Sequence, residues 1–244
     1  MAQRISRAKR TVSGQPFAQP GDVAVVLRVL YLIFNEGYSG RVDLSAEAIR
    51  LTRQLALGCD EPEVAGLLAL MLLHHARRAA RTDEHGTLIP LDKQDRTGWN
   101  QAEITDGVRI LRAALARDRR GEYQIQAAIA ALHNDARTAG ETDWPQILAW
   151  YDELLELTGN PVAALSRAVA IGEVDGPLAG LAAAEELATR LGDHHRLDAV
   201  RARLHERAGH PDLAAEHYTR AAAQARNTAE RDYLTKQAAR LRHG

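Results

Sequence analysis

Ten histidines are the residues of this 244-residue sequence whose chemistry could support a metal site or acid–base catalysis. The closest clusters along the chain are His74-His75, His133 with Asp135, and His194-His195. Adjacent side chains on a helix point about 100° apart, and the H-E-x-x-H pattern of a zinc-binding helix is absent. The single cysteine excludes a multi-cysteine zinc site and an intramolecular disulfide. The sequence therefore predicts no metal site and no cofactor, with histidines that are solvated or held in the core.

Motifs for covalent catalysis and for phosphate binding are also absent. A serine nucleophile of the G-x-S-x-G type needs a strand before it and a helix after it, and the sequence has neither the motif nor the strands. No G-x-x-x-x-G-K-[ST] or G-x-G-x-x-G phosphate loop occurs. We therefore expect a protein that catalyses no reaction.

A set of polar residues in mostly apolar or irregular surroundings indicates function better than the histidine clusters do. Its members are Asn35, Glu36, Arg77, Arg78, Asp95, Arg96 and Trp99. A buried acid costs several kcal/mol unless it is paired, so Glu36 beside an arginine would clamp two helices together. The alternative is a polar patch that recognises a partner.

Asp175, which precedes Gly176 and Pro177, also has two interpretations. It could cap the start of the helix that Pro177 opens, because Asp is favoured before a helix and Pro in its first turn. It could instead belong to a partner patch.

Helices must position these residues. Apolar residues at 23, 26, 27, 30, 33 and 34 have helical spacing, and Val25, Val29 and Leu32 fill the other side. The pattern predicts a helix buried on most faces, ended by Gly37 in the left-handed conformation. Further helices are expected from Ser45 to Leu57 and from Pro62 to about Arg81.

The segment 82–100 lacks helical periodicity. It predicts a short hairpin around Glu84, His85 and Gly86, followed by an ordered loop that is functional or wrapped onto the helices. Helices are then expected at about 100–117, 122–136, 144–158, 161–173, 177–191, 196–208, 211–225 and 228–242.

The second half of the chain contains a repeat. Pro177 and Pro211 are 34 residues apart, and small residues recur at that offset at Ala168 and Ala202. Such a period is typical of tetratricopeptide repeats, in which paired helices stack on their neighbours. The sequence thus predicts an all-α fold, with a helical bundle followed by tetratricopeptide-like antiparallel helix pairs, an α-solenoid. We expect three parts: residues 1–20, a helical subdomain over 21–140, and repeats with a capping helix over 141–244.

The overall charge is balanced, with 31 Lys and Arg against 32 Asp and Glu, so no general field would attract nucleic acid or an anionic membrane. The apolar stretches are interrupted or shorter than the roughly 20 residues of a membrane span, and no secretory signal is found. These features predict a soluble, cytoplasmic protein. Basic residues cluster only in the opening MAQRISRAKRTV, which a Pro- and Gly-containing linker follows.

That opening resembles the recognition helix of region 4 in extracytoplasmic-function sigma factors, without its first helix and turn. The rest resembles, in order, the C-terminal tetratricopeptide-like extension of such a group. The segments that carry this resemblance are VLYLIFNEGYSG, EPEVAGLLALMLLHHARRAARTD, LIPLDKQDRTGWN, YQIQAAIAALHNDAR, TDWPQILAWYDELL and NPVAALSRAVAIGEVDGPLAGL.

The resemblance implies that Gln3, Arg4 and Arg7 would face DNA in an intact parent, with Lys9 and Arg10 near phosphates. Region 2 and the first part of region 4 have no counterpart in this sequence, so we expect the chain to be the C-terminal part of a sigma factor. RNA polymerase and promoter DNA would then be partners through the missing regions.

Three functions follow as expectations. The first is a regulatory domain of an alternative sigma factor that acts in transcription initiation. The second is a stand-alone tetratricopeptide adaptor that binds a peptide or small protein in the groove of its repeats. The third is an enzyme or small-ligand sensor that uses the 82–100 loop.

Overall fold

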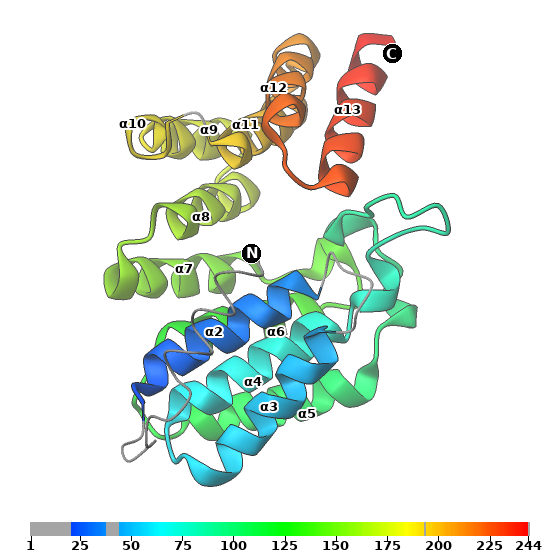
Figure 1. Ribbon diagram of the computed structural model, residues 1–244. Coiled ribbons are helices and arrows are strands. Elements are labelled where there is room, and N and C mark those ends of the chain that lie inside the picture. The colour runs from blue at the N-terminus through cyan, green and yellow to red at the C-terminus, as the bar shows by residue number, and fades with distance from the viewer. Residues whose placement is uncertain (1–20, 38–43, 193, 244) are drawn as a thin grey trace, which may run out of the picture.

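The computed structural model of the chain describes residues 21–37, 44–192 and 194–243. Secondary structure in these ranges is helical, apart from one isolated antiparallel bridge between Thr82 and Leu88. The helices form a bundle from which antiparallel pairs extend as a curved stack (Figure 1). The predicted all-α fold, a bundle followed by an α-solenoid, is confirmed.

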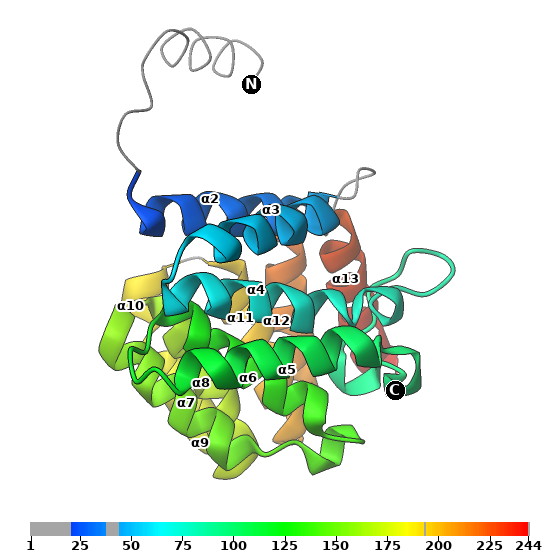
Figure 2. The ribbon, with the colours of Figure 1, turned by 90° about the horizontal axis from the view of Figure 1, so that it is seen from below.

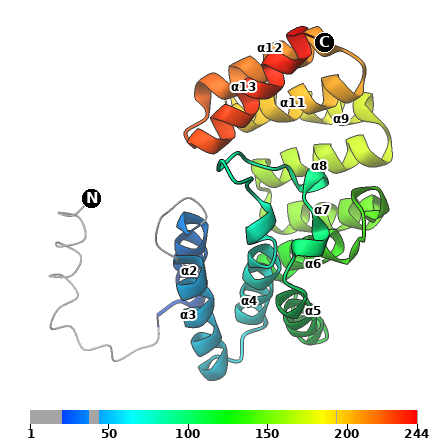
Figure 3. The ribbon, with the colours of Figure 1, turned by 90° about the vertical axis from the view of Figure 1, so that its right-hand side faces the viewer.

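The bundle is built around one helix that is apolar on all sides. Its helices are α2 (Val23–Glu36), α3 (Leu44–Gly58), α4 (Pro62–His75), α5 (Gln101–Leu115) and α6 (Glu122–Asp135). Helix α4 lies between the α2–α3 layer and the α5–α6 layer (Figure 3). Its residues from Leu67 to Leu73 are all buried, because they face both layers.

Helices α4 and α6 are joined by hydrogen bonds at both ends. The Glu63 carboxylate of α4 accepts bonds from the backbone N–H groups of Tyr123 and Gln124, at 2.9 and 3.0 Å, and so caps the start of α6. At the other end, Asn134 donates its side-chain N–H to the carbonyl oxygen of Leu73 at 2.9 Å. The pair therefore forms a fixed platform.

The repeats follow the 34-residue period. Their helices are α7 (Trp144–Thr158), α8 (Pro161–Val174), α9 (Pro177–Glu185), α10 (Ala188–Leu191), α11 (His195–Arg207), α12 (Pro211–Gln224) and α13 (Thr228–His243). The pairs α8–α9 and α11–α12 are equivalent, and Ala168 and Ala202 are buried where each pair crosses. The core is continuous across residue 140, because Ile125 of α6 packs in one cluster with Ile147 and Leu154 of α7.

The α8–α9 crossing depends on glycine. A Cβ on Gly180 would lie 2.8 Å from the carbonyl oxygen of Ala168 and 2.8 Å from the Cα of Gly172. Real Cβ atoms do not approach backbone atoms so closely, so only glycine allows these helices to pack at this distance.

Three sequence expectations were wrong. Helix α2 is not buried on most faces: Val25, Val29 and Leu32 are 50–60% exposed, because α2 is an edge helix that packs mainly on α3 and α4. Gly37 is right-handed, with φ −64°, since its N–H and the Ser45 hydroxyl already bind the last carbonyl oxygens of α2.

The third expectation concerned helix ends. Helix α4 ends at His75, and a separate 3-10 helix, Arg78–Ala80, takes the place of the expected continuation to Arg81. The helix expected over 177–191 is interrupted after Glu185. Local apolar spacing continues through both breaks, so the sequence pattern alone did not reveal them.

The segment 82–100 joins the 3-10 helix η1 (Arg78–Ala80) to α5 within the bundle and lies against the repeats, and we call it the connecting segment. It begins with the predicted hairpin, in which Gly86 has φ +77° and Asp83 donates its N–H to the carbonyl oxygen of Thr87 at 3.0 Å. Two 3-10 helices follow, η2 (Leu91–Lys93) and η3 (Arg96–Gly98). The hairpin reaches toward α13 (Figure 3), where Lys236 Nζ donates to the Thr87 hydroxyl at 3.2 Å. Of the two alternatives for this loop, a functional loop or one wrapped onto the helices, the contact with α13 fits the second.

Candidate functional site

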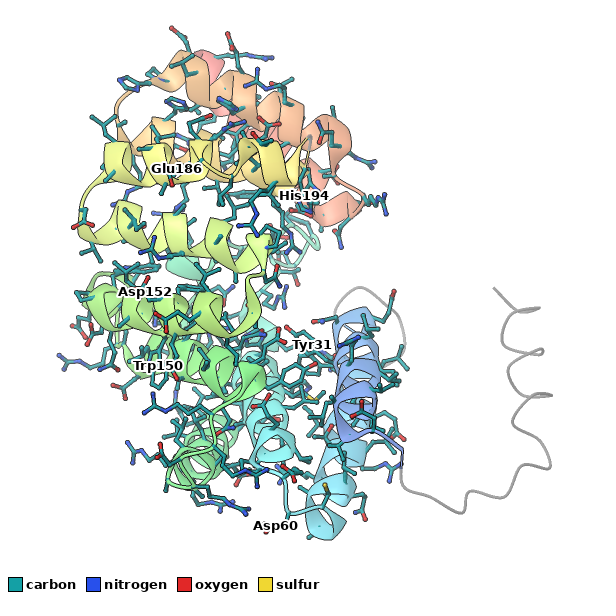
Figure 4. The ribbon with its side chains drawn as sticks, turned by 90° about the vertical axis from the view of Figure 1, so that its left-hand side faces the viewer. Tyr31, Asp60, Trp150, Asp152, Glu186 and His194 are labelled. Atoms are coloured by element: carbon teal, nitrogen blue, oxygen red, sulfur yellow. The ribbon has the colours of Figure 1, made fainter. Side chains whose placement is uncertain are left out.

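A cavity of about 380 Å³ lies where the bundle meets the repeats. Its walls come from α2, α4 and α6 on one side and from α7, α8 and the start of α11 on the other, with Leu91 of the connecting segment between them. Figure 4 shows Tyr31 on the side of α2 that faces the repeats, and His194 at the near end of α11. The volume is within the range of small-ligand pockets.

The inner end of this cavity holds two imidazoles. Burial lowers the pKa of His74 well below its usual value, and the positive charges of Arg77 and Arg81 lower it further. Burial, together with Arg77 and Arg96, lowers the pKa of His133 to about 4. Both rings are therefore neutral at pH 7. Within the described ranges neither ring forms a hydrogen bond, although His133 packs edge-on to Trp144 with ring centroids 5.2 Å apart.

Two tyrosines line the same cavity. Burial raises the pKa of Tyr31, whose ring also meets Tyr123 edge-on at 5.6 Å. Burial raises the pKa of Tyr151 as well, and a hydrogen bond with Ser166 partly offsets that effect. Both phenols stay protonated at neutral pH and can donate a hydrogen bond.

A second hollow of about 290 Å³ adjoins the first. Leu91, His133, Tyr151 and Ser166 line both, so the two spaces meet at these side chains. The second hollow continues toward Arg96 and is more apolar than the first.

Two residues of the predicted polar set hold the connecting segment in place. Arg96 donates through one Nη to the carbonyl oxygens of His133 and Ala136, at 2.5 and 2.8 Å, and so caps the C-terminus of α6. Its guanidinium lies 4.7 Å from the ring centre of the buried Trp99, and that of Arg77 lies 5.8 Å from the same ring. Asp95 bonds only locally, to Thr97.

The other members do not form one site. Asn35 and Glu36 are exposed at the end of α2, and Arg78 is exposed on η1. The burial that the clamp interpretation assumed for Glu36 is therefore not found. The expectation that Asp175 caps the helix after it was also wrong: Gly176, with φ +97°, occupies that position, and Asp175 ends α8 by donating its N–H to the carbonyl oxygen of Ile171.

A third hollow, of about 710 Å³, lies between the connecting segment and helices α11, α12 and α13. It is lined by Tyr218 and Tyr233 and by several arginines, and residues 90–93 of the connecting segment form one edge. Asp92 pairs there with Arg203 at 3.4 Å.

Of the two histidine pairs that are adjacent in sequence, His194 and His195 stack on each other with ring centroids 5.0 Å apart, whereas His74 and His75 make separate contacts. His74 faces the first cavity, whereas His75 Nδ1 lies 2.9 Å from a carboxylate oxygen of Glu103. The structure also shows a cluster that sequence spacing missed, because His205 stacks on His217 from a different helix, with ring centroids 5.3 Å apart. In the part of the chain that is described, no three His, Cys, Asp or Glu side chains converge as metal ligands.

The expected DNA-contacting residues Gln3, Arg4, Arg7, Lys9 and Arg10 lie outside the described residues. Among the described helices, none is long and apolar enough to cross a membrane. The cavity residues that sequence analysis did not single out, Tyr31, Tyr151 and Ser166, lie on three helices within apolar stretches. Only tertiary packing brings them together.

Two comparisons with known proteins bear on this chain. Residues 23–115 match the model of a family of unknown function, DUF6596. The matched range covers α2 to α5 and the connecting segment, and so includes one wall of the cavity. An uncharacterized protein of Rhizobium meliloti (strain 1021) is 42% identical to this chain over an alignment of 253 residues, gaps included, and the alignment covers 97% of this chain. The chain spans 60% of the length of that relative.

Proposed function

We propose that the chain is a regulatory and interaction domain of an alternative extracytoplasmic-function sigma factor, acting in transcription initiation without catalysing a reaction itself. The ordered resemblance along the chain supports this, as does the match to DUF6596, a family associated with the C-terminal part of sigma factors. A relative that is longer than this chain also fits a domain of a larger protein.

The observation that carries the proposal is the exposed apolar stripe on α2. Val25, Val29 and Leu32 are 53, 50 and 60% exposed, and their spacing places them on one face of the helix. Contiguous exposed apolar residues mark interaction surfaces. In the proposed sigma factor, α2 is the helix that follows the end of region 4.

Its proposed occupant is region 4 of the same polypeptide. The linker between them, from about Thr11 to Pro20, would span at most about 35 Å. Such a tether gives an effective concentration on the order of millimolar, so even a weak apolar contact would be populated. RNA polymerase and promoter DNA are then reached through regions 2 and 4.

In vitro transcription tests this proposal with a factor that carries regions 2 and 4 ahead of this chain. Removing residues 21–244 should change the transcript yield, and the pair Val29→Lys and Leu32→Lys should reproduce that change. Leu178→Lys is the matched control, because Leu178 is 64% exposed on α9, outside the stripe. Equal yields from all four proteins would disprove the regulatory role.

The second candidate function is a stand-alone adaptor for a peptide or small protein, and the 710 Å³ hollow of the last repeats favours it. A peptide there would contact Tyr218, Tyr233 and Arg240, so Tyr233→Ala should weaken binding of a peptide selected against the chain. Selection that returns only peptides insensitive to Tyr233→Ala would argue against this groove.

A further inference from the structure

The cavity between the bundle and the repeats has the charge and shape of a ligand site. We propose that it binds a small organic anion, a carboxylate with an aliphatic or aromatic body, whose charged end lies beside Arg77, His74 and His133. This inference does not depend on the sigma-factor proposal.

The first argument is the positive charge at the inner end of the cavity, beside His74 and His133. Arg77 lines the cavity, and Arg96 lines the adjoining hollow, whose two acids, Asp92 and Glu173, both pair with Arg203. Arg96 donates to two carbonyl oxygens instead of a carboxylate, so an acid does not neutralise its charge among the described residues. The charges that depress the pKa values of His74 and His133 at neutral pH belong to arginines, namely Arg77, Arg81 and Arg96. An anion is the complement of such an end.

The second argument is hydrogen-bonding capacity. A neutral imidazole has one donor and one acceptor, and both rings leave these groups unused within the described ranges while facing the cavity. Neither ring is fully buried, so these groups remain open to the cavity. A carboxylate placed between the two rings could accept a hydrogen bond from each.

The third argument is the remainder of the wall. Beyond the imidazoles the cavity is lined by aliphatic side chains of three helices, Leu70 of α4, Ile129 of α6 and Leu154 of α7. These would cover an apolar body. The one acid in the wall, Glu122, begins α6, whereas His133 lies about three turns further along the same helix. The acid is therefore at the opposite, outer end of the cavity, where it acts on Tyr31 of α2.

The size of the cavity favours a small molecule over a folded partner. Side chains from α2, α4, α6, α7, α8 and α11 line a volume of about 380 Å³, which is too small for a helix but sufficient for an aryl or alkyl acid. Because the walls belong to both the bundle and the repeats, a bound ligand would contact both parts of the chain.

Calorimetric titration of the full chain tests the proposal with phenylacetate, phenylpropionate, phenylbutyrate and the straight-chain acids from hexanoate to decanoate. Each acid is compared with its uncharged primary amide. We expect at least one acid to bind with a Kd below about 1 mM and about tenfold more tightly than its amide. Histidine ring signals in NMR spectra should shift for His74 and His133.

Three variants distinguish binding in the cavity from binding on the surface of the protein. Arg77→Gln should weaken binding of the acid about tenfold, the loss expected when a charged hydrogen bond is removed, whereas Arg78→Gln next to it should have little effect. Ser166→Phe should fill the cavity and abolish binding of acid and amide alike. If Ser166→Phe does not fold, the comparison of Arg77→Gln with Arg78→Gln decides the matter.

Three results would overturn the inference. One is that no acid of the series binds with a Kd below about 1 mM. Another is that amides bind as tightly as acids, or that Arg77→Gln and Arg78→Gln behave alike. The last is that the NMR shifts fall on the exposed stripe of α2 instead of on the cavity.

Discussion

Arg96 shows how a residue that looks like part of a binding patch can instead hold a fold together. Its guanidinium joins the end of α6 to the connecting segment, through two carbonyl oxygens and the ring of Trp99. These contacts fix His133, whose carbonyl oxygen is one of the two acceptors. The side chain thus supports the inner end of the cavity as well as the loop.

Substitution of Arg96 should therefore cost stability. We expect Arg96→Gln to lower the free energy of unfolding by about 2–3 kcal/mol, because two charged hydrogen bonds and a cation–π contact are lost. Arg109→Gln is the control: its side chain is 70% exposed in a surface pair with Asp106, and a loss of no more than about 1 kcal/mol is expected. Urea unfolding would measure both, and equal losses would contradict the assignment.

The histidines of the cavity predict the pH dependence of stability. The folded chain keeps His133 neutral down to a pKa of about 4, whereas in the unfolded chain the residue takes up a proton near pH 6.5. The unfolded state therefore binds more protons between these values, and stability falls as pH drops from about 6.5 to 4.

We expect His133→Gln to reduce the loss of stability between pH 6.5 and pH 4 by on the order of 3 kcal/mol. His85→Gln is the control, because His85 lies at an exposed turn. Urea unfolding at several pH values would measure it. If His133→Gln leaves the slope of the free energy of unfolding against pH unchanged, other titrating groups determine the pH dependence of stability.

At the scale of elements, the starts of helices were the most predictable feature, whereas two helix ends were missed. Pro161, Pro177 and Pro211 start helices α8, α9 and α12, and Asn160 caps α8 through the N–H of Val162 at 2.9 Å. These are local signals, which a sequence displays directly. Which face of a helix is buried depends on its neighbours, and for that reason the exposure of α2 was missed.

The candidate site was less predictable for the same reason. Arg96 was singled out from sequence, but its contacts at the end of α6 join residues 37 or more positions apart. The cavity brings Tyr31, His74 and Tyr151 from three helices. No local spacing encodes that arrangement. The 34-residue repeat predicted the solenoid because each repeat contacts mainly its neighbours.

The α8–α9 crossing gives a test at this scale. Gly180→Ala should lower the free energy of unfolding by about 1–3 kcal/mol, because the new methyl group meets backbone atoms of α8 that cannot rotate away. Gly140→Ala is the control, since a Cβ there meets nothing within 4 Å. Thermal unfolding of both would measure the difference. Identical melting temperatures would show that the two helices can move apart at little cost.

Over the whole molecule, the connecting segment is the element that ties the bundle to the far end of the repeats. Asp92 reaches Arg203 of α11, and Thr87 reaches Lys236 of α13. Viewed from below, the last helices lie behind the bundle (Figure 2). These contacts oppose any opening of the stack away from the bundle.

Loss of the Asp92 contact should loosen the repeats selectively. We expect Asp92→Asn to raise native-state hydrogen exchange in α11 to α13 about two- to fivefold, the effect of a half-exposed ion pair worth up to about 1 kcal/mol. Exchange in α4 and α6 should stay unchanged. Asp106→Asn, which removes a pair inside the bundle, serves as the control. Uniform acceleration in every helix would show that the chain opens only as one unit.

The contact between Asp92 and Arg203 also has a consequence for folding. Most helices here pack on the next helix along the chain, and such contacts close short loops and form quickly. Asp92 and Arg203 are 111 residues apart, so their contact closes a much longer loop at a greater entropic cost. The contact between Asp92 and Arg203 should therefore form late, after the neighbouring helices α6 and α7 have packed together and formed most of the cavity wall. Docking of the connecting segment would then complete that wall with Leu91.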